Sequence, residues 1–205
     1  MLKTPYLDRI VSRETLKKIE KYCDFLIEYN KKLNLISKST ENIIMSRHIE
    51  DSSQLLKYIK SEDKNILDIG SGAGFPGIVM YIIKNDLNLE FNLDIVEKSS
   101  KKCTYLQELC KFLEIDVVIH NHDVKNLEKK NYTTLVSRAF KPLDSFLHIL
   151  DMSNITFNKI LLLKGQSFNT ELTEAEKHWE IKCDTHESVT NPGSKVVVIN
   201  SVKKI

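Results

Sequence analysis

The segment N-I-L-D-I-G-S-G-A-G-F-P-G at residues 65–77 carries the most chemical information in this chain. Four of the six glycines lie within residues 70–77, and Asp68 stands two residues ahead of the first of them. Glycine adopts backbone angles closed to other residues and lets a ligand touch the backbone. A strand that leads into a glycine turn and then a helix is typical of a nucleotide-type pocket. Residues 65–77 therefore predict a ligand site that includes Gly70, Gly72 and Gly74.

Two ligand classes fit this pocket. The spacing Gly72-x-Gly74-x-x-Gly77 formally matches the dinucleotide fingerprint, which is a weak signal by itself. Glu97 lies twenty residues further on, at the end of the next expected strand, where a carboxylate can accept from both ribose hydroxyls. This holds equally for NAD and for S-adenosylmethionine.

Acidic side chains at strand ends favour the second ligand. A pyrophosphate would be repelled by an Asp68 carboxylate facing the mouth of the loop, at a cost on the order of several kcal/mol. S-adenosylmethionine carries a sulfonium and an ammonium group and no phosphate. After a third expected strand, Asp123 and the backbone N–H of Val124 can pair with an adenine. The alternative for Glu97 and Asp123 is that both are solvated loop carboxylates.

The elements that must position these residues alternate from residue 61 onward. Helical spacing at 77–84 and 101–113 separates short apolar runs, which predicts a doubly wound, mostly parallel seven-stranded sheet in an α/β Rossmann-like domain. The turn Asn191-Pro192-Gly193 leaves no room for a helix, so we expect a C-terminal hairpin and one antiparallel edge strand. The expected strands are residues 66–69, 91–96, 117–120, 134–137, 160–163, 180–188 and 196–199.

Residues 1–60 have helical spacing instead, which predicts an N-terminal helical extension before the domain at 61–205. Leu16, Ile19, Cys23 and Leu26 mark the apolar face of a first helix that closes near residues 30–34. A second helix is expected at about residues 41–59, with a cap at residue 39 or 40.

Composition sets few further limits. The chain is 41% hydrophobic with a net charge of +2, which neither demands nor excludes a nucleic-acid partner. No run of about 18 apolar residues and no secretory signal is seen, so we expect a cytoplasmic protein with no membrane span, and we expect a monomer. The four cysteines lack C-x-x-C spacing and are expected to be buried thiols. His120 and His122 have no third ligand nearby in sequence, so no metal site is expected.

Four further motifs flank the glycine loop in order. Together they resemble the bacterial RsmG (GidB) family, which methylates the N7 atom of one guanine in small-subunit ribosomal RNA. The resemblance covers about residues 22–204 and depends mainly on the last three motifs. They are N-L-I-S at 34–37, R-H-I-E-D-S at 47–52, S-R-A-F at 137–140 and L-K-G at 163–165.

The resemblance implies S-adenosylmethionine as cofactor and assigns residues to its site. Gly70 and Phe75 line the site, Asp123 and Val124 hold the adenine, and Arg138 completes it. Glu97 stands where family members have the ribose acid. Two departures concern the RNA side: Asn34 begins a segment that often contains Thr in the family, and His122 occupies a position where Arg can occur.

The implied chemistry needs no general base, because guanine N7 attacks the sulfonium methyl with a free lone pair. Rate would come from alignment in a dry, polar pocket, so no catalytic residue is assigned and Arg138, Arg47 and His48 remain candidates. Arg138 has three alternative roles. It orients the cofactor, it selects guanine by donating to the guanine oxygen, or it forms an ion pair with a pocket acid such as Asp68. Arg47 and His48 open the second expected helix. Either both contact RNA there, or Arg47 forms an internal ion pair with Asp51.

Substrate contacts are the least determined part. Asn34 and Lys164 are further substrate candidates; Lys164 meets phosphate or caps the pocket. The resemblance implies small-subunit ribosomal RNA as the partner, either naked or in the 30S subunit. The rival functions are an NAD-dependent oxidoreductase and a non-catalytic RNA-binding protein with a methyltransferase fold. A set of basic side chains either contacts RNA phosphates or forms solvated helix faces. These side chains are Lys3, Arg9, Arg13, Lys17, Lys18, Lys31, Lys32, Lys38, Lys101 and Lys102.

Overall fold

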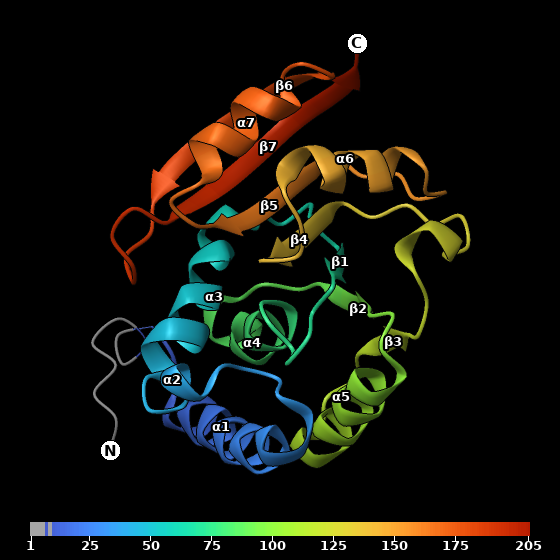
Figure 1. Cartoon of the computed structure of the whole chain (residues 1–205). Helices are drawn as coiled ribbons and strands as arrows, with labels where there is room; N and C mark the ends of the chain where they lie inside the picture. The colour runs from blue at the N-terminus through green and yellow to red at the C-terminus, as the bar shows by residue number, and fades with distance from the viewer. Residues whose placement is uncertain (1–6, 8–9) are drawn as a thin grey trace.

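The computed structural model describes residue 7 and residues 10–205, and one seven-stranded sheet forms its centre (Figure 1). The strand order is β3-β2-β1-β4-β5-β7-β6. β1 is paired in parallel with β2 and with β4, so the chain reverses its direction of winding beside β1. The strands are β1 (Asn65–Ile69), β2 (Asn92–Val96), β3 (Val118–His120), β4 (Thr134–Arg138), β5 (Lys159–Lys164), β6 (Trp179–Glu187) and β7 (Lys195–Lys204).

The sequence analysis predicted all seven strands and the C-terminal hairpin, and the structure confirms them. One detail was wrong. The strand that runs against the others is β7, which pairs antiparallel with both β5 and β6 and lies one position inside the edge. The edge strand is β6. The physical reason is burial: four consecutive residues of β7, Val196 to Ile199, are buried, whereas β6 alternates between the core and solvent.

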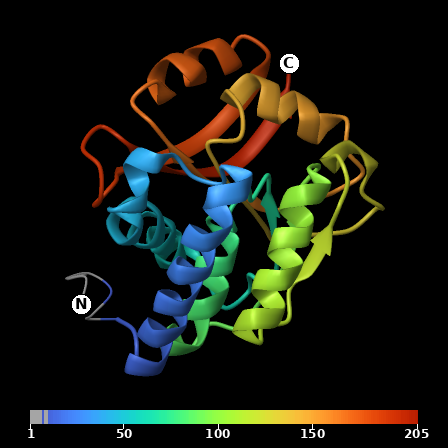
Figure 2. The same ribbon diagram turned by 60° about the horizontal axis from the view of Figure 1, so that its bottom comes forward.

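Helices cover both faces of the sheet (Figures 1 and 2). On one face, α4 (Gly77–Ile83) and α5 (Ser100–Leu113) share an apolar core with α1 (Arg13–Leu33). On the other face, α6 (Leu143–Asp151) and α7 (Phe168–Ala175) build a second core with β4, β5 and β7. Single-turn 3-10 helices stand at Lys84–Leu87 and Val124–Asn126.

The predicted first helix is confirmed as α1. Ser12 caps its start by accepting from the Thr15 N–H, and Asn34 ends it with a left-handed backbone (φ 47°). Its apolar side chains pack in the same core as α4 and α5. α1 is therefore a third helix on that face of the sheet, and the boundary of the extension near residue 60 stays a prediction.

The expected single helix at 41–59 was wrong in form. The segment divides into α2 (Lys38–Glu41), a π-helix (Met45–Glu50), α3 (Asp51–Ser53) and a 3-10 helix (Gln54–Tyr58), and the residue before α2 is Ser37. Buried polar side chains provide the reason. Ser52 Oγ donates to the His48 carbonyl at 2.6 Å and Ser53 Oγ to the Glu50 carbonyl at 2.8 Å, so side chains compete for the acceptors that a regular helix uses.

All four cysteines are free thiols. Cys23, Cys103 and Cys110 are buried, as expected, whereas Cys183 on the edge strand β6 is only half-buried. In the part of the chain that the structure describes, no helix is long and apolar enough to cross a membrane.

Asn30 holds together the turn between α1 and α2. This side chain is 4% exposed, accepts from the Ile36 N–H at 2.9 Å and donates to the Ile36 carbonyl at 3.1 Å. It also donates to Glu41 at 2.6 Å. One amide thereby satisfies both backbone groups of a buried residue.

We expect Asn30→Ala to lower the free energy of unfolding by about 3 kcal/mol, because both Ile36 backbone groups lose their partner while they remain buried. Urea denaturation followed by circular dichroism measures the change. The control is Lys31→Ala, whose partner Glu28 is exposed, and it should change stability far less. Equal effects of the two substitutions would contradict the role assigned to Asn30.

Candidate functional site

The glycine loop between β1 and α4 takes its shape from contacts with elements on either side. Gly70, Gly72 and Gly74 have φ of 71°, 60° and 104°, a region that favours glycine. The hydroxyls of Tyr22 on α1 and Tyr105 on α5 both donate to the Ala73 carbonyl, at 2.7 and 3.1 Å. Sequence reasoning missed both tyrosines, since each is simply one apolar position of a helical pattern.

Asp68 lies beneath this loop. The side chain is fully buried, and one carboxyl oxygen accepts from Ser71 Oγ at 2.6 Å and from the Gly77 N–H at 2.8 Å. A Cβ at Gly77 would lie 2.7 Å from that oxygen, so glycine is required there. The expectation that Asp68 faces the mouth of the loop was wrong: because its carboxyl meets the loop from inside, it fixes the start of α4.

Burial dominates the ionisation of Asp68 and raises the pKa of its carboxyl to about 7, although the hydrogen bonds from Ser71 and Gly77 act in the opposite direction. Its other oxygen is buried and accepts no hydrogen bond. Near neutral pH this side chain therefore exchanges between a neutral and a charged form.

A cavity of about 290 Å³ opens beside the loop, at the carboxyl ends of β1, β2, β3 and β4. It brings together four of the sequence-predicted cofactor residues: Gly70, Glu97, Asp123 and Val124. Glu97 is 7% exposed and accepts from the N–H groups of Gly72, at 3.3 Å, and Ser99, at 2.9 Å. This is the edge of a doubly wound sheet at which ligands bind.

The cavity also contains residues that sequence reasoning did not propose. Phe140 packs against Gly70 so closely that a Cβ on Gly70 would lie 2.3 Å from the ring. Lys98, Lys141 and Ile149 line the wall, as do His122 and Lys102, which the sequence had marked for the RNA side. Lys98, His122 and Lys141 stand just after strand ends, a signal that could have identified them, whereas Lys102 and Ile149 lie inside α5 and α6. Asp68, Gly72, Gly74, Phe75 and Arg138 do not line this cavity.

A second cavity, of about 340 Å³, lies next to the first. Its lining includes Arg47, His48, Arg138 and Lys164, four of the residues marked for substrate or catalysis. Ala139, with a φ of 50°, lines both cavities. The S-R-A-F segment thus forms the boundary between the two spaces.

Arg138 is held on three sides. Its guanidinium lies 3.7 Å from the Asp51 carboxylate and 4.6 Å from the centre of the Phe75 ring, and it donates to the Arg47 carbonyl at 3.3 Å. Its ion pair is therefore with Asp51 and not with Asp68. Among the described residues, no ion pair joins Arg47 to Asp51, so that alternative was wrong.

His48 stacks on Phe75, with ring centroids 5.0 Å apart and planes 11° from parallel. Phe75 is 2% exposed, so it supports the second cavity from below instead of lining the first. Burial, together with the nearby Arg138 and Arg47 charges, lowers the pKa of His48 to about 3. His48 is consequently a neutral imidazole at physiological pH.

The two remaining substrate candidates, Lys164 and Asn34, lie in different surroundings. Lys164 pairs with Glu171 at 2.8 Å and donates to the Lys141 carbonyl at 2.7 Å, and its side chain is 8% exposed. Asn34 is the exposed end residue of α1 and lines neither cavity. His120, one of the two histidines weighed as metal ligands, pairs with Asp94 at 2.9 Å.

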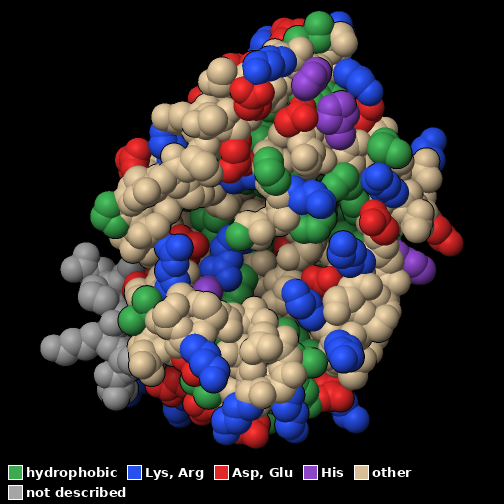
Figure 3. Space-filling view, in the orientation of Figure 1, with side chains coloured by type: hydrophobic (Ala, Val, Ile, Leu, Met, Phe, Trp, Pro, Cys, Tyr) green, Lys and Arg blue, Asp and Glu red, His purple; other side chains and the backbone are tan. Residues whose placement is uncertain are grey.

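Of the basic candidates, Lys3 and Arg9 lie outside the described residues. Lys31, Lys32 and Lys38 are exposed near the junction of α1 and α2, close in sequence to Ser37 and Thr40 of the second cavity. Figure 3 shows Lys and Arg side chains spaced around the hollowed middle of one face of the molecule.

The strand order, with β7 inserted antiparallel, and the cavity at the carboxyl ends of β1 to β4 define the class I, Rossmann-like methyltransferase fold. Solved structures with this fold include a SAM-dependent methyltransferase from Aquifex aeolicus (TM-score 0.57, 13% identity, 77% of this chain and 93% of that one). TYW2 of M. jannaschii in complex with AdoMet also matches (TM-score 0.53, 17% identity, 77% and 76%).

Sequence comparison gives the family. The GidB family model, described as rRNA small subunit methyltransferase G, matches residues 15–198. Proteins named ribosomal RNA small subunit methyltransferase G are 34% identical in Rickettsia prowazekii, over 95% of this chain and 98% of that protein, and 32% identical in Paramagnetospirillum magneticum, over 95% and 92%. The chain belongs to the GidB family, and the resemblance seen in its motifs is confirmed.

Burial of Asp68 predicts an unusual pH dependence of stability. Because the folded-state pKa is raised to about 7, the folded protein binds a proton that the unfolded chain releases near its ordinary pKa of 3.8. The resulting stability is complete below the unfolded-state pKa and falls as pH rises toward 7. Asn at this position keeps one acceptor oxygen and carries no titrating proton.

We therefore expect the free energy of unfolding of the wild type to fall by on the order of 3 kcal/mol between about pH 4 and pH 7. The Asp68→Asn variant should not show this fall. Urea titrations across that range measure it, with Asp116→Asn, a change outside the glycine loop, as the control. Parallel pH profiles for the wild type and the Asp68 variant would overturn the assignment.

Proposed function

We propose that this chain transfers a methyl group from S-adenosylmethionine to the N7 atom of a guanine in small-subunit ribosomal RNA. The main supporting observation is the adjacency of two cavities that meet at Ala139. One carries the acids of a nucleoside site and the other is lined by positive charge. A methyl transferase needs such a pair of spaces, because donor and acceptor must approach in line.

The first cavity suits the cofactor. Glu97 offers a nearly buried carboxylate at the end of β2 for the ribose hydroxyls, and Asp123 with the Val124 N–H offers an acceptor and a donor for adenine. Gly72 lies outside the cavity lining, but a Cβ there would meet no atom closer than 4.0 Å, so its backbone is open to a ligand that extends beyond the cavity. S-adenosylmethionine, when bound, supplies an electrophilic methyl group on a sulfonium.

The second cavity suits the guanine. The Arg138 guanidinium and the Arg47 side chain offer donors for a guanine oxygen and for phosphate, and Lys195 adds positive charge. Arg138 is fixed by Asp51 and Phe75, so its direction is set before substrate arrives. Preorganised donors of this kind stabilise charge in a transition state without reorganisation.

The residues of the second cavity fit a reaction without a general base. His48, with its pKa lowered to about 3, is a weak base and is hydrogen-bonded to Thr40 at 3.0 Å, and Lys164 is held by Glu171. Guanine N7 has a free lone pair and loses no proton before attack. We therefore assign His48 to positioning, through its stacking on Phe75.

The RNA must present an unstacked base, because a guanine within a helix cannot reach the cavity beside Ala139. The substrate is naked small-subunit RNA or the assembled 30S subunit, and the basic side chains around the cavities are the proposed phosphate contacts. We further propose that the protein acts as a monomer in the cytoplasm.

The decisive experiment supplies the purified chain with methyl-labelled S-adenosylmethionine and small subunits from cells that lack the gene. We expect label in the small-subunit RNA at one guanine, with strand cleavage specific for N7-methylguanine at that nucleotide. Binding of NAD in place of S-adenosylmethionine would favour an oxidoreductase. RNA binding without label transfer would favour a non-catalytic RNA-binding protein.

Glu97→Gln tests the cofactor site. Loss of the charged acceptor should weaken S-adenosylmethionine binding roughly 10- to 100-fold, the value of a charge-assisted hydrogen bond. Isothermal titration measures it, with Glu90→Gln, an exposed residue paired with Lys64, as the matched control. Unchanged affinity in the Glu97 variant would remove this residue from the site.

Arg138→Ala tests the boundary between the cavities. We expect methyl transfer to be lost while S-adenosylmethionine binding and the far-ultraviolet spectrum persist, because Arg138 lines only the second cavity. Asp51 retains donors from Thr190 at 2.8 Å and Gln54 at 3.2 Å, so the fold should tolerate the change. Full activity of the variant would contradict the role.

A further inference from the structure

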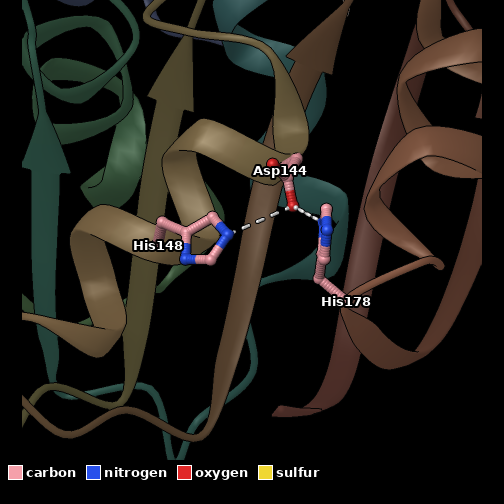
Figure 4. Close-up of side chains that lie close together, drawn as sticks. All are labelled: Asp144, His148 and His178. Atoms are coloured by element: carbon pink, nitrogen blue, oxygen red, sulfur yellow. Dashed lines mark hydrogen bonds and ion pairs between the residues drawn. The ribbon is translucent and has the colours of Figure 1, made fainter. Parts of the chain in front are cut away.

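Three potential metal ligands converge at a place unrelated to the two cavities (Figure 4). Asp144 and His148 stand one helical turn apart on α6, and His178 lies in the turn between α7 and β6. In sequence His178 is thirty residues from His148, which is why the spacing gave no metal signal. Only the fold brings the two imidazoles to one carboxylate.

The ligand atoms already have metal-site spacing. His178 Nδ1 lies 3.0 Å and His148 Nε2 lies 3.6 Å from Asp144 Oδ1, and all three atoms are within 4.8 Å of one another. Ligands of a tetrahedral zinc ion at roughly 2.0–2.1 Å are about 3.3 Å apart. Small rotations of the two exposed imidazoles would therefore complete three corners of a tetrahedron, with water at the fourth.

The surroundings hold these ligands in place. The Trp179 indole, 4% exposed, donates through Nε1 to Asp144 Oδ1 at 3.0 Å, and its ring packs edge-on against His148 with centroids 5.0 Å apart. The backbone of His178 is fixed by hydrogen bonds to Ala175 and from Ile205. Such outer hydrogen bonds orient the ligands of natural metal sites.

The chemistry of the donor set selects the ion. Two imidazoles and one carboxylate suit zinc and its neighbours among the first-row transition metals, whereas magnesium and calcium prefer oxygen ligands alone. The side chains of His148 and His178 are 42% and 55% exposed, so an ion can enter from solvent.

We propose that Asp144, His148 and His178 bind one divalent transition-metal ion of the zinc class, which fastens α6 to the start of β6. This site is separate from the proposed methyl-transfer function, and its test does not depend on that activity. The ion joins segments that are thirty residues apart, so binding should stabilise the folded state.

The experiment uses the full chain without an affinity tag, stripped of metal with a chelator. Cobalt titration should give visible ligand-field bands that saturate at one equivalent and disappear on adding zinc, without a thiolate-to-cobalt band. Zinc at about 100 times its Kd should raise Tm by roughly 5 °C. X-ray absorption of the zinc form should show only nitrogen and oxygen neighbours, at about 2.0–2.1 Å.

His148→Gln and His178→Gln should each abolish the cobalt bands and the zinc-dependent rise in Tm. Trp179→Phe should leave the ligands but weaken zinc binding about 10- to 100-fold. The matched control is His186→Gln, an exposed histidine of β6 packed on Tyr58, which should bind metal like the wild type. No saturable cobalt binding, or binding that survives both ligand substitutions, would overturn the proposal and leave the methyl-transfer proposal intact.

Discussion

The structure depends on how the glycine loop after β1 is anchored by polar groups that are themselves buried. Asp68 bonds to Ser71 and to the first N–H of α4 from beneath, while the Tyr22 and Tyr105 hydroxyls bond to the Ala73 carbonyl. Three segments of the chain thus fix one loop. Because a buried polar group without a partner is costly, each of these contacts also requires the others to stay in place.

This anchoring explains why the N-terminal helices belong to the site. Tyr22 ties α1 to the loop, the π-helix brings His48 onto Phe75, and α3 directly after it brings Asp51 to Arg138. Arg138 is fixed between an acid of the N-terminal part and a ring of the glycine loop. The second cavity therefore has one wall from the N-terminal segment and one from the carboxyl end of the sheet.

A methyl donor remains the favoured ligand, but the charge of Asp68 is no longer a reason for it. Asp68 does not repel a phosphate at the mouth of the pocket, since it is fully buried under the loop and its pKa is raised toward neutrality. Two other acids, Glu97 and Asp123, line the first cavity. Membership in the GidB family and the S-R-A-F segment between the two cavities now support a methyl donor, in place of the charge of Asp68.

The amino-acid sequence was sufficient to predict the seven strands, the end of α1 within residues 30–34 and the grouping of Gly70, Glu97, Asp123 and Val124, because periodicity and strand-end position are local properties. It also identified the family through motifs of adjacent residues. Contacts between distant parts of the folded chain settled the rest: where β7 lies, which acid pairs with Arg138, that Lys164 is held by Glu171, and that two histidines meet Asp144. These outcomes depend on which side chains meet across the fold and on how deeply each is buried. Neither the contact partners nor the burial of a side chain can be read from a single position in the sequence.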